Sequence, residues 1–151
     1  MINPLFLRSP QGRKFCAFLF GLHPPYIEAI HQTIKNQIPV VRKSMAEAYG
    51  AVYLRAWKAS EGPYRIRIER DCIQDLMHCA VHASTPALFA AVSRILGRFH
   101  ESKKVPGIDA MLASCYEPIL WRALKVANYV VRQNAATLFV DAFPLQVQTT
   151  P

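Results

Sequence analysis

Apolar residues recur at helical spacing along most of the chain, and proline, glycine and polar residues interrupt them at short intervals. Pro25 can begin one such helix, on which Ile27, Ile30 and Ile34 fall on a single stripe. Their i, i+3, i+7 spacing is that of a buried helix face. Pro39 ends the helix, because the residue before a proline avoids helical backbone angles. The pattern therefore predicts a series of helices joined by short turns.

A helix expected from about Val41 to Trp57 carries two apolar stripes. The first stripe comprises Met45, Ala48, Tyr49, Val52 and Ala56, and the second comprises Ala46, Gly50, Tyr53 and Trp57. Two stripes indicate burial on two sides, as in a helix that lies between neighbours. Gly50 costs about 1 kcal/mol of helix propensity relative to alanine, so we expect another helix to cross closely at this point.

Residues 64–69, YRIRIE, alternate apolar and basic side chains, a pattern that alone is typical of a strand. The segment is short and runs directly into RDCIQDLMHCAVHA, whose apolar residues follow a helical period. We therefore predict a helix here. Further helices are expected after the Ser84–Pro86 start signal, from Ile108 with Pro118 inside it, and from Val131 to Phe143.

The first helix is predicted over residues 9–22. Ser9 can cap it, Pro10 fits its first position and Gly21 fits its end. Three basic residues precede FCAFLFGL, an arrangement that also resembles a signal or transit peptide. The apolar stretch is short and no small-residue cleavage site follows it, which favours an amphipathic helix.

The helices group into a leading helix and three pairs, over residues 24–59, 63–102 and 107–144, with an irregular tail at 145–151. Arg42 and Arg132 each follow two valines, open the second helix of their pairs and lie 90 residues apart. A period of roughly 40–47 residues built from two helices is typical of HEAT repeats. We therefore predict an all-α fold, an α-solenoid of antiparallel helix pairs with about seven helices (HEAT/armadillo-like).

In a stacked array, a buried arginine with an Asp or Asn partner can form a ladder between repeats. Asn36 precedes Arg42 by six residues, whereas Val126 stands at the corresponding place before Arg132, with Asn128 nearby. The middle pair lacks the Val-Arg pattern, so the ladder is incomplete. A ligand contact is the alternative role for Arg132. The predicted structural positions are Asn36, Arg42, Pro118, Asn128 and Arg132.

Composition and charge narrow the functional classes. Hydrophobic residues make up 52% of the chain and charged residues 19%, which excludes a disordered chain. The net charge is +8, and residues 1–70 carry +7 of it. Such a basic half suggests an anionic partner such as duplex DNA, held through its backbone, or only a solvated surface on which Lys43 pairs with Glu47. The candidate DNA-contacting residues are Lys35, Lys43, Arg55, Lys58, Arg65, Arg67 and Arg70.

The sequence contains few of the patterns that indicate a catalytic or cofactor-binding site. The six glycines are scattered and form no phosphate-binding loop, and no serine lies in a nucleophile elbow. Cys72, Asp75, Cys79 and His82 share one helix face, but ligands spread over three turns cannot close around one zinc ion. We expect no cofactor, no metal, no small-molecule substrate and no enzyme activity. The apolar stretches are also shorter than the roughly 20 residues of a transmembrane helix.

Several strings resemble one particular family of HEAT-repeat proteins. FLRSPQGRKF, IHQTIKNQI, YLRAWK, DCIQDLMH and YEPILWRALKVAN followed by VRQNAATLFVDAFPL are similar to the G-type HEAT-repeat non-SMC subunits of condensin II, from Leu5 to Leu145. YRIRIER is more basic than the family pattern, and QVQTTP does not continue as the family does. The family's proteins are far longer, so the chain resembles one early segment, as a fragment or a truncated isoform would.

The resemblance implies a nuclear scaffold subunit that binds the kleisin and, with the rest of condensin II, DNA, during mitotic chromosome condensation. It implies no catalysis, because ATP hydrolysis belongs to the SMC subunits. A generic HEAT-repeat adaptor for other protein partners is the alternative. An array cut from a longer one exposes apolar faces at its ends, so we expect self-association through Ala142, Phe143 and the stripe of FCAFLFGL.

Overall fold

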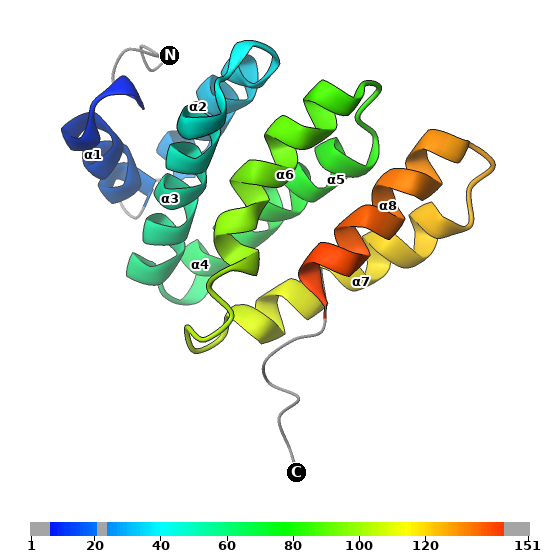
Figure 1. Ribbon diagram of the computed structural model, residues 1–151. Coiled ribbons are helices and arrows are strands. Elements are labelled where there is room, and N and C mark those ends of the chain that lie inside the picture. Colours follow the sequence, from blue (N-terminus) through cyan, green and yellow to red (C-terminus); the bar gives the residue numbers. More distant parts are fainter. Residues whose placement is uncertain (1–6, 21–23, 144–151) are drawn as a thin grey trace.

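The computed structural model describes residues 7–20 and 24–143 of the chain, and every regular element in these ranges is a helix (Figure 1). The α-helices are α1 (Pro10–Phe20), α2 (Pro24–Gln37), α3 (Lys43–Ala59), α4 (Gly62–Ile68), α5 (Gln74–Val81), α6 (Pro86–His100), α7 (Ile108–Leu124) and α8 (Tyr129–Ala142). A 3-10 turn, η2 (Ile38–Val40), follows α2, and a π-helical segment, η3 (Glu69–Ile73), joins α4 to α5 without a break. The all-α prediction is confirmed.

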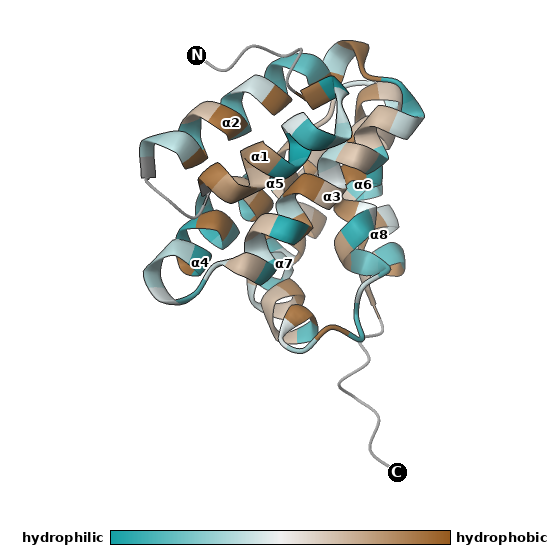
Figure 2. Ribbon diagram, turned by 90° about the vertical axis from the view of Figure 1, so that its left-hand side faces the viewer, coloured by the Kyte–Doolittle hydropathy of each residue, from teal (hydrophilic) through white to brown (hydrophobic). Residues whose placement is uncertain are grey.

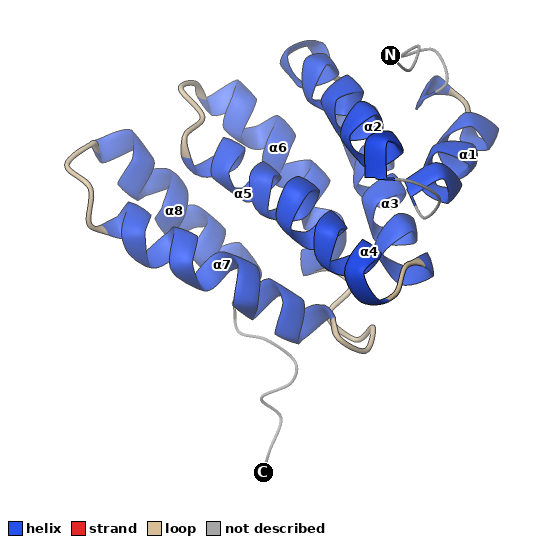
Figure 3. Ribbon diagram, turned by 180° about the vertical axis from the view of Figure 1, so that it is seen from behind, coloured by secondary structure: helices blue, strands red, loops and turns tan. Residues whose placement is uncertain are grey.

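The helices lie in two layers that run in chain order across the molecule. Figure 1 shows α3, α6 and α8 side by side in the nearer layer, and Figure 3 shows α2, α4, α5 and α7 in the layer behind them. Helix α1 covers the free side of α3 at one end, and α7 and α8 form the other end. This serial stacking is the helical-repeat architecture that the sequence predicts.

Polar side chains mark the starts of three helices, two of them at predicted positions. The Ser9 hydroxyl accepts a hydrogen bond from the Gly12 amide at 2.9 Å, and the Thr85 hydroxyl accepts one from the Leu88 amide at 3.1 Å. The Asn128 side chain caps α8 in the same way. Each cap satisfies an amide that has no partner inside its own helix. Gly21, the predicted end of the first helix, lies outside the described residues.

Helix α3 is buried on both sides, as its two stripes predict. It packs against α1 on one side and α6 on the other. A Cβ atom added at Gly50 would lie 2.5 Å from the Ile95 carbonyl oxygen, so only glycine allows α6 to approach this closely. Seven buried residues of α3 come from the two stripes, and Leu54 is buried as well: Ala46, Tyr49, Gly50, Val52, Tyr53, Leu54, Ala56 and Trp57.

Some details differ from the sequence prediction. YRIRIE is helical, as predicted, but the last helix begins at Tyr129 rather than Val131, because Asn128 caps it there. Ala142, expected at an exposed end, is fully buried against neighbouring helices. On α1, by contrast, Phe15 and Phe18 are 50% and 60% exposed. Figure 2 views the molecule from this end and shows hydrophobic residues of α1 among hydrophilic ones.

No helix in the described ranges is both long enough and apolar enough to span a lipid bilayer.

Candidate functional site

The seven candidate basic residues do not form one surface. Lys35, Arg67 and Arg70 line a cavity of about 500 Å³ between α2 and the π-helical segment η3. Lys43, Arg55 and Lys58 lie on α3, in the other layer, and are exposed. The structure therefore divides the predicted basic set between two layers.

Two of the residues beside the α2–η3 cavity are already neutralised. The Lys35 ammonium lies 2.8 Å from an Asp75 carboxylate oxygen, and the Arg67 guanidinium lies 3.0 Å from an Asp71 carboxylate oxygen. The Asp75 hydrogen bond raises the pKa of Lys35 and keeps it charged. Glu28 also lines the cavity, so its charge is mixed rather than basic. A phosphate backbone would have to compete with these carboxylates for Lys35 and Arg67.

The guanidinium group of Arg65 also makes contacts within the chain. Its guanidinium lies over the Trp57 ring, 4.1 Å from the ring centre, and its Nε donates to the Trp57 carbonyl at 3.1 Å. A further contact joins its Nη2 to the Lys58 carbonyl at 3.4 Å. These bonds satisfy carbonyls at the end of α3 that have no partner in their own helix. Arg65 thus closes the turn between α3 and α4.

The remaining candidates have free charged groups. Among the described residues, no ion pair involves Lys43, Arg55, Lys58 or Arg70. The Lys43–Glu47 pair, which belonged to the alternative of a solvated surface, does not form. At 3.6 residues per turn, the three side chains on α3 fall within about 120° of one another around the helix. The strongest candidate surface for an extended anion is therefore this side of α3.

A buried polar network, absent from the sequence prediction, joins three helices beside the α2–η3 cavity. His31 on α2 contacts the Tyr53 hydroxyl through Nδ1 at 2.6 Å and the Asp75 carboxylate through Nε2 at 2.7 Å. Because a carboxylate only accepts, Nε2 carries the proton and donates it to Asp75. The hydrogen bonds from His31 and Lys35 lower the pKa of Asp75 to about 2, against the burial that opposes them.

The network accounts for one residue of the metal-ligand pattern, Asp75. Within the ranges that the structure describes, no group of three or more histidine, cysteine or acidic side chains could hold a metal ion. The four cysteines are free thiols. Burial raises the pKa of Cys115 to about 12 and raises that of Cys72 further, so both remain protonated and are poor nucleophiles.

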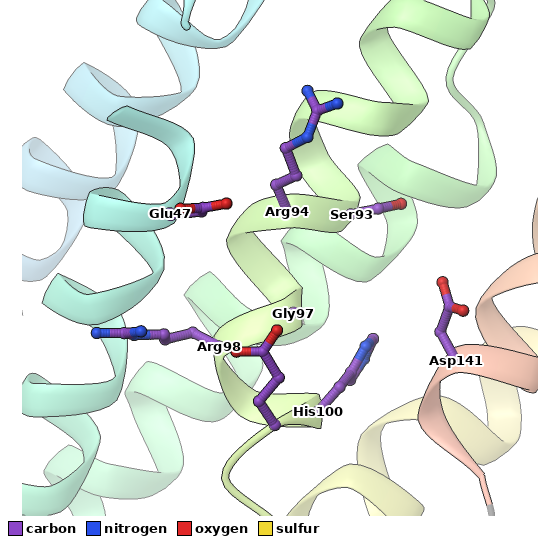
Figure 4. A pocket seen from close by; sticks show the side chains of 8 residues that line it. Glu47, Ser93, Arg94, Gly97, Arg98, His100 and Asp141 are labelled. Carbon is purple, nitrogen blue, oxygen red and sulfur yellow. The ribbon is translucent and has the colours of Figure 1, made fainter. Parts of the chain in front are cut away.

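A larger polar cleft of about 660 Å³ lies between α3, α6 and α8, and none of the seven candidates lines it. Figure 4 shows Glu47 on α3, Arg94 and Arg98 on α6, and Asp141 on α8 around this space. Both signs of charge are present, which suits a polypeptide better than a polyanion. His100 borders the cleft and contacts the Tyr116 hydroxyl at 2.6 Å; burial and the nearby Lys103 lower its pKa to about 4.

The predicted repeat positions make local contacts. Arg132 donates through Nη1 to the carbonyls of Val126 and Ala127, at 2.8 and 2.7 Å, and so closes the turn of its own pair. Pro118 lies inside α7. Asn36 accepts from Gln32 instead of pairing with Arg42. The expected arginine ladder between repeats is therefore wrong for the first pair, where Arg42 is exposed.

Side chains other than these arginines join neighbouring pairs, and Asn134 is one of them. Asn134 of α8 donates through Nδ2 to the carbonyls of Val81 and Ala83, both at 3.1 Å. These carbonyls lie at the end of α5, where the helix leaves them without internal partners. Sequence reasoning missed Asn134 because its partners lie more than fifty positions away in the chain.

Residues 1–147 match the family described as the condensin II non-structural-maintenance-of-chromosomes subunit. The chain belongs to this condensin II subunit family. The chain is 42% identical to the Condensin-2 complex subunit G2 of Mus musculus over 146 residues, 96% of this chain and 13% of the relative. It is 43% identical to that of Xenopus laevis over 141 residues, 93% of this chain and 12% of the relative. No solved structure matches the chain.

The condensin II resemblance seen in the sequence is thus confirmed over nearly the whole chain. The Homo sapiens subunit G2 gives the same picture, with 42% identity over 147 residues, which are 13% of that protein. The chain spans about an eighth of the curated relatives it matches. In this condensin II segment the α3 cations and the polar cleft are two of the exposed features.

Proposed function

We propose that this chain is a non-catalytic scaffold segment of a condensin II subunit, which supports binding of the kleisin in the nucleus during mitotic chromosome condensation. The observation that carries the proposal is the family match over residues 1–147, on a described fold of stacked helix pairs. A stacked array presents long surfaces to a partner and needs no enclosed site. The polar cleft between α3, α6 and α8 offers both donors and acceptors to a polypeptide.

The proposal includes sequence-independent contact with duplex DNA through α3. Lys43, Arg55 and Lys58 support this part, because their charges are exposed and have no acidic partner among the described residues. Such cations attract the phosphate backbone and do not read base sequence. Arg70 can add a contact from the other layer.

A capture experiment tests the scaffold role. Immobilised recombinant condensin II kleisin is expected to retain the chain, and a variant with charge reversals in the polar cleft, Arg94→Glu and Arg98→Glu, is expected to be retained less. The matched control is Arg122→Glu with Lys125→Glu, which carries equal reversals outside the cleft. If the chain does not bind the kleisin but binds other proteins from nuclear extract, the result would support the generic HEAT-repeat adaptor instead.

DNA contact is tested by measuring affinity for a short duplex over a range of salt concentrations. Binding should weaken steeply with salt and show no sequence preference. Replacing Lys43, Arg55 and Lys58 by alanine should flatten the salt dependence by about one unit of log–log slope per residue. The variant with Lys104, Arg122 and Lys125 replaced loses equal charge elsewhere and should keep most of the slope. Equal losses in both variants would show that only net charge matters.

A further inference from the structure

A second cavity, of about 390 Å³, lies where the start of α3 meets the segment before α1. Its polar groups come from Arg8, Arg42 and Tyr49, together with Gln37. Val40, Val41 and Met45 form an apolar wall. No acidic residue lines it, unlike the α2–η3 cavity and the polar cleft. The cavity therefore has a positive interior that no carboxylate of its own lining neutralises.

The two arginines in this cavity have guanidinium groups without a partner among the described residues. Arg8 and Arg42 are exposed, and among the described residues neither has an ion-pair or hydrogen-bond partner for its guanidinium. Neighbouring Arg13 shows the contrast, since its Nη1 donates to the Leu7 carbonyl at 3.0 Å. Guanidinium groups bind phosphate oxygens in a bidentate manner, so two of them at one cavity favour an oxyanion.

Tyr49 supplies a third polar group to the cavity. The residue is only 3% exposed, it lines the cavity, and its hydroxyl has no hydrogen-bond partner among the described residues. The hydroxyl is not among the buried polar atoms without a partner in the described ranges, which are Ser93 Oγ and Asp109 Oδ1, so it is open to solvent. Burial raises the pKa of Tyr49, while the charges of Arg8 and Arg13 act in the opposite direction. The hydroxyl can therefore donate a hydrogen bond to a ligand in the cavity.

The start of α3 adds donors of a different kind. Arg42 occupies the N-cap position of this 17-residue helix, and no side chain caps it. The first amides of a helix point outward without partners and carry the positive end of the helix dipole. Met45, in the first turn, lines the cavity, so this helix end faces the same space as the two arginines.

We propose that the cavity binds a phosphorylated side chain of a partner protein. Arg8 and Arg42 pair with the phosphate oxygens, and the Tyr49 hydroxyl donates to one of them. The uncapped start of α3 stabilises the negative charge. Phosphate recognition by clustered arginines is a common way to read a phosphorylated peptide.

The shape and lining of the cavity favour a peptide over duplex DNA. Val40, 77% exposed, stands at the cavity with Val41, and an apolar residue beside the phosphate can cover them. A protein that binds the phosphate backbone of DNA uses cations spread along a surface, as on α3. An apolar wall adds nothing to its affinity for the phosphates. A flexible peptide can place a single phosphate inside a concave site. This proposal is independent of kleisin and DNA binding by the polar cleft and by α3.

Fluorescence anisotropy with paired peptides tests the proposal on the full chain. The probe is a labelled peptide with one phosphothreonine between apolar residues, and its partner is the same peptide without phosphate. The phosphorylated form should bind tighter, on the order of tenfold, which corresponds to about 1.4 kcal/mol. Inorganic phosphate should compete weakly. Equal affinity for the two peptides would overturn the proposal.

Variants locate the binding. Arg42→Ala should remove most of the preference for the phosphorylated peptide, and Tyr49→Phe should reduce it several-fold while keeping the buried ring. Arg122→Ala, at an exposed position outside both this cavity and the polar cleft, is the control and should bind normally. Circular dichroism confirms that each variant is folded. Phosphopeptide binding that survives Arg42→Ala, or a duplex that displaces the peptide and is itself weakened by Tyr49→Phe, would refute a peptide site.

Discussion

Three side chains from three helices meet between the first two helix pairs, and they illustrate what a single residue contributes to this fold. Tyr53 is fully buried, and its hydroxyl contacts His31 Nδ1 at 2.6 Å. His31 in turn donates to Asp75. Each group is costly to bury alone, but together they satisfy one another. The network therefore fixes α2 and α5 relative to α3.

Removing the Tyr53 hydroxyl should lower the stability of the fold, because the hydrogen-bond network is then incomplete. Tyr53→Phe leaves His31 Nδ1 buried without its partner, and we expect the free energy of unfolding to fall by about 1–3 kcal/mol. Urea denaturation followed by circular dichroism measures the change. Tyr64→Phe, at an exposed position on α4, is the matched control and should change stability by less than about 0.5 kcal/mol. Equal stability of the two variants would mean that the Tyr53 bond contributes nothing.

Asp75 predicts a specific response to acid. Its pKa is about 2 in the folded chain, below its ordinary value of 3.8, so the unfolded chain takes up the proton first as the pH falls. The stabilisation by the paired carboxylate is fully present above pH 3.8 and is lost as the pH falls towards 2. Asp75→Asn should be less stable than the parent at neutral pH, and the difference should shrink through this window. A difference that stays constant with pH would exclude this linkage.

At the scale of elements, the contact between α3 and α6 depends on one glycine. At Gly50 a Cβ would lie 2.5 Å from the Ile95 carbonyl oxygen, whereas at Gly97 on α6 a Cβ would meet nothing within 4 Å. Both are helical positions where alanine has the better propensity, by about 1 kcal/mol. Comparing alanine substitutions at Gly50 and Gly97 therefore distinguishes the effect of helix packing on stability from the effect of helix propensity.

Alanine at the two glycines should have opposite effects. Gly50→Ala forces the helices apart and should destabilise the chain by about 1–3 kcal/mol, because overpacking outweighs the gain in propensity. Gly97→Ala should stabilise it by up to about 1 kcal/mol. Thermal unfolding of the two variants and the parent measures both. Stabilisation by Gly50→Ala would contradict the close crossing of α3 and α6.

Local signals account for the elements that the sequence predicts well. Ser9 and Thr85 cap helices as expected, and the double stripe of α3 predicts its central position. The π-helical segment Glu69–Ile73 gave no sequence signal, because an extra residue within a continuous helix disturbs the apolar period only slightly. Likewise, the His31 network and the Asn134 contact depend on distant segments meeting. The sequence alone shows that the N-terminal half is basic. It does not show that Lys35 pairs with Asp75 and Arg67 with Asp71, because these pairs depend on the three-dimensional structure.

At the scale of the whole molecule, both ends of the stack carry exposed aromatic side chains. Phe15 and Phe18 are exposed on α1, and at the opposite end Trp121 is 56% exposed. Trp121, Phe139 and Phe143 also line an apolar cavity of about 150 Å³ between α7 and α8. Contacts between unlike faces at opposite ends are head-to-tail, and they build either a ring or an open chain of copies.

We expect the chain to associate with itself through these ends. Sedimentation velocity should show the mean sedimentation coefficient rising with concentration, and Phe18→Ser with Trp121→Ser should suppress the rise. Ile66→Ser, which removes a 50% exposed apolar side chain on α4, away from α1, α7 and α8, is the control and should associate like the parent. A parent chain that sediments as a monomer at high concentration would rule out association.

Isothermal titration of the 151-residue chain with recombinant condensin II kleisin tests the scaffold role most directly. Saturable binding is predicted, and the Arg94→Glu, Arg98→Glu variant should bind more weakly than the Arg122→Glu, Lys125→Glu control. Absence of measurable heat at any kleisin concentration, with the chain shown to be helical and folded, would contradict a kleisin-binding scaffold.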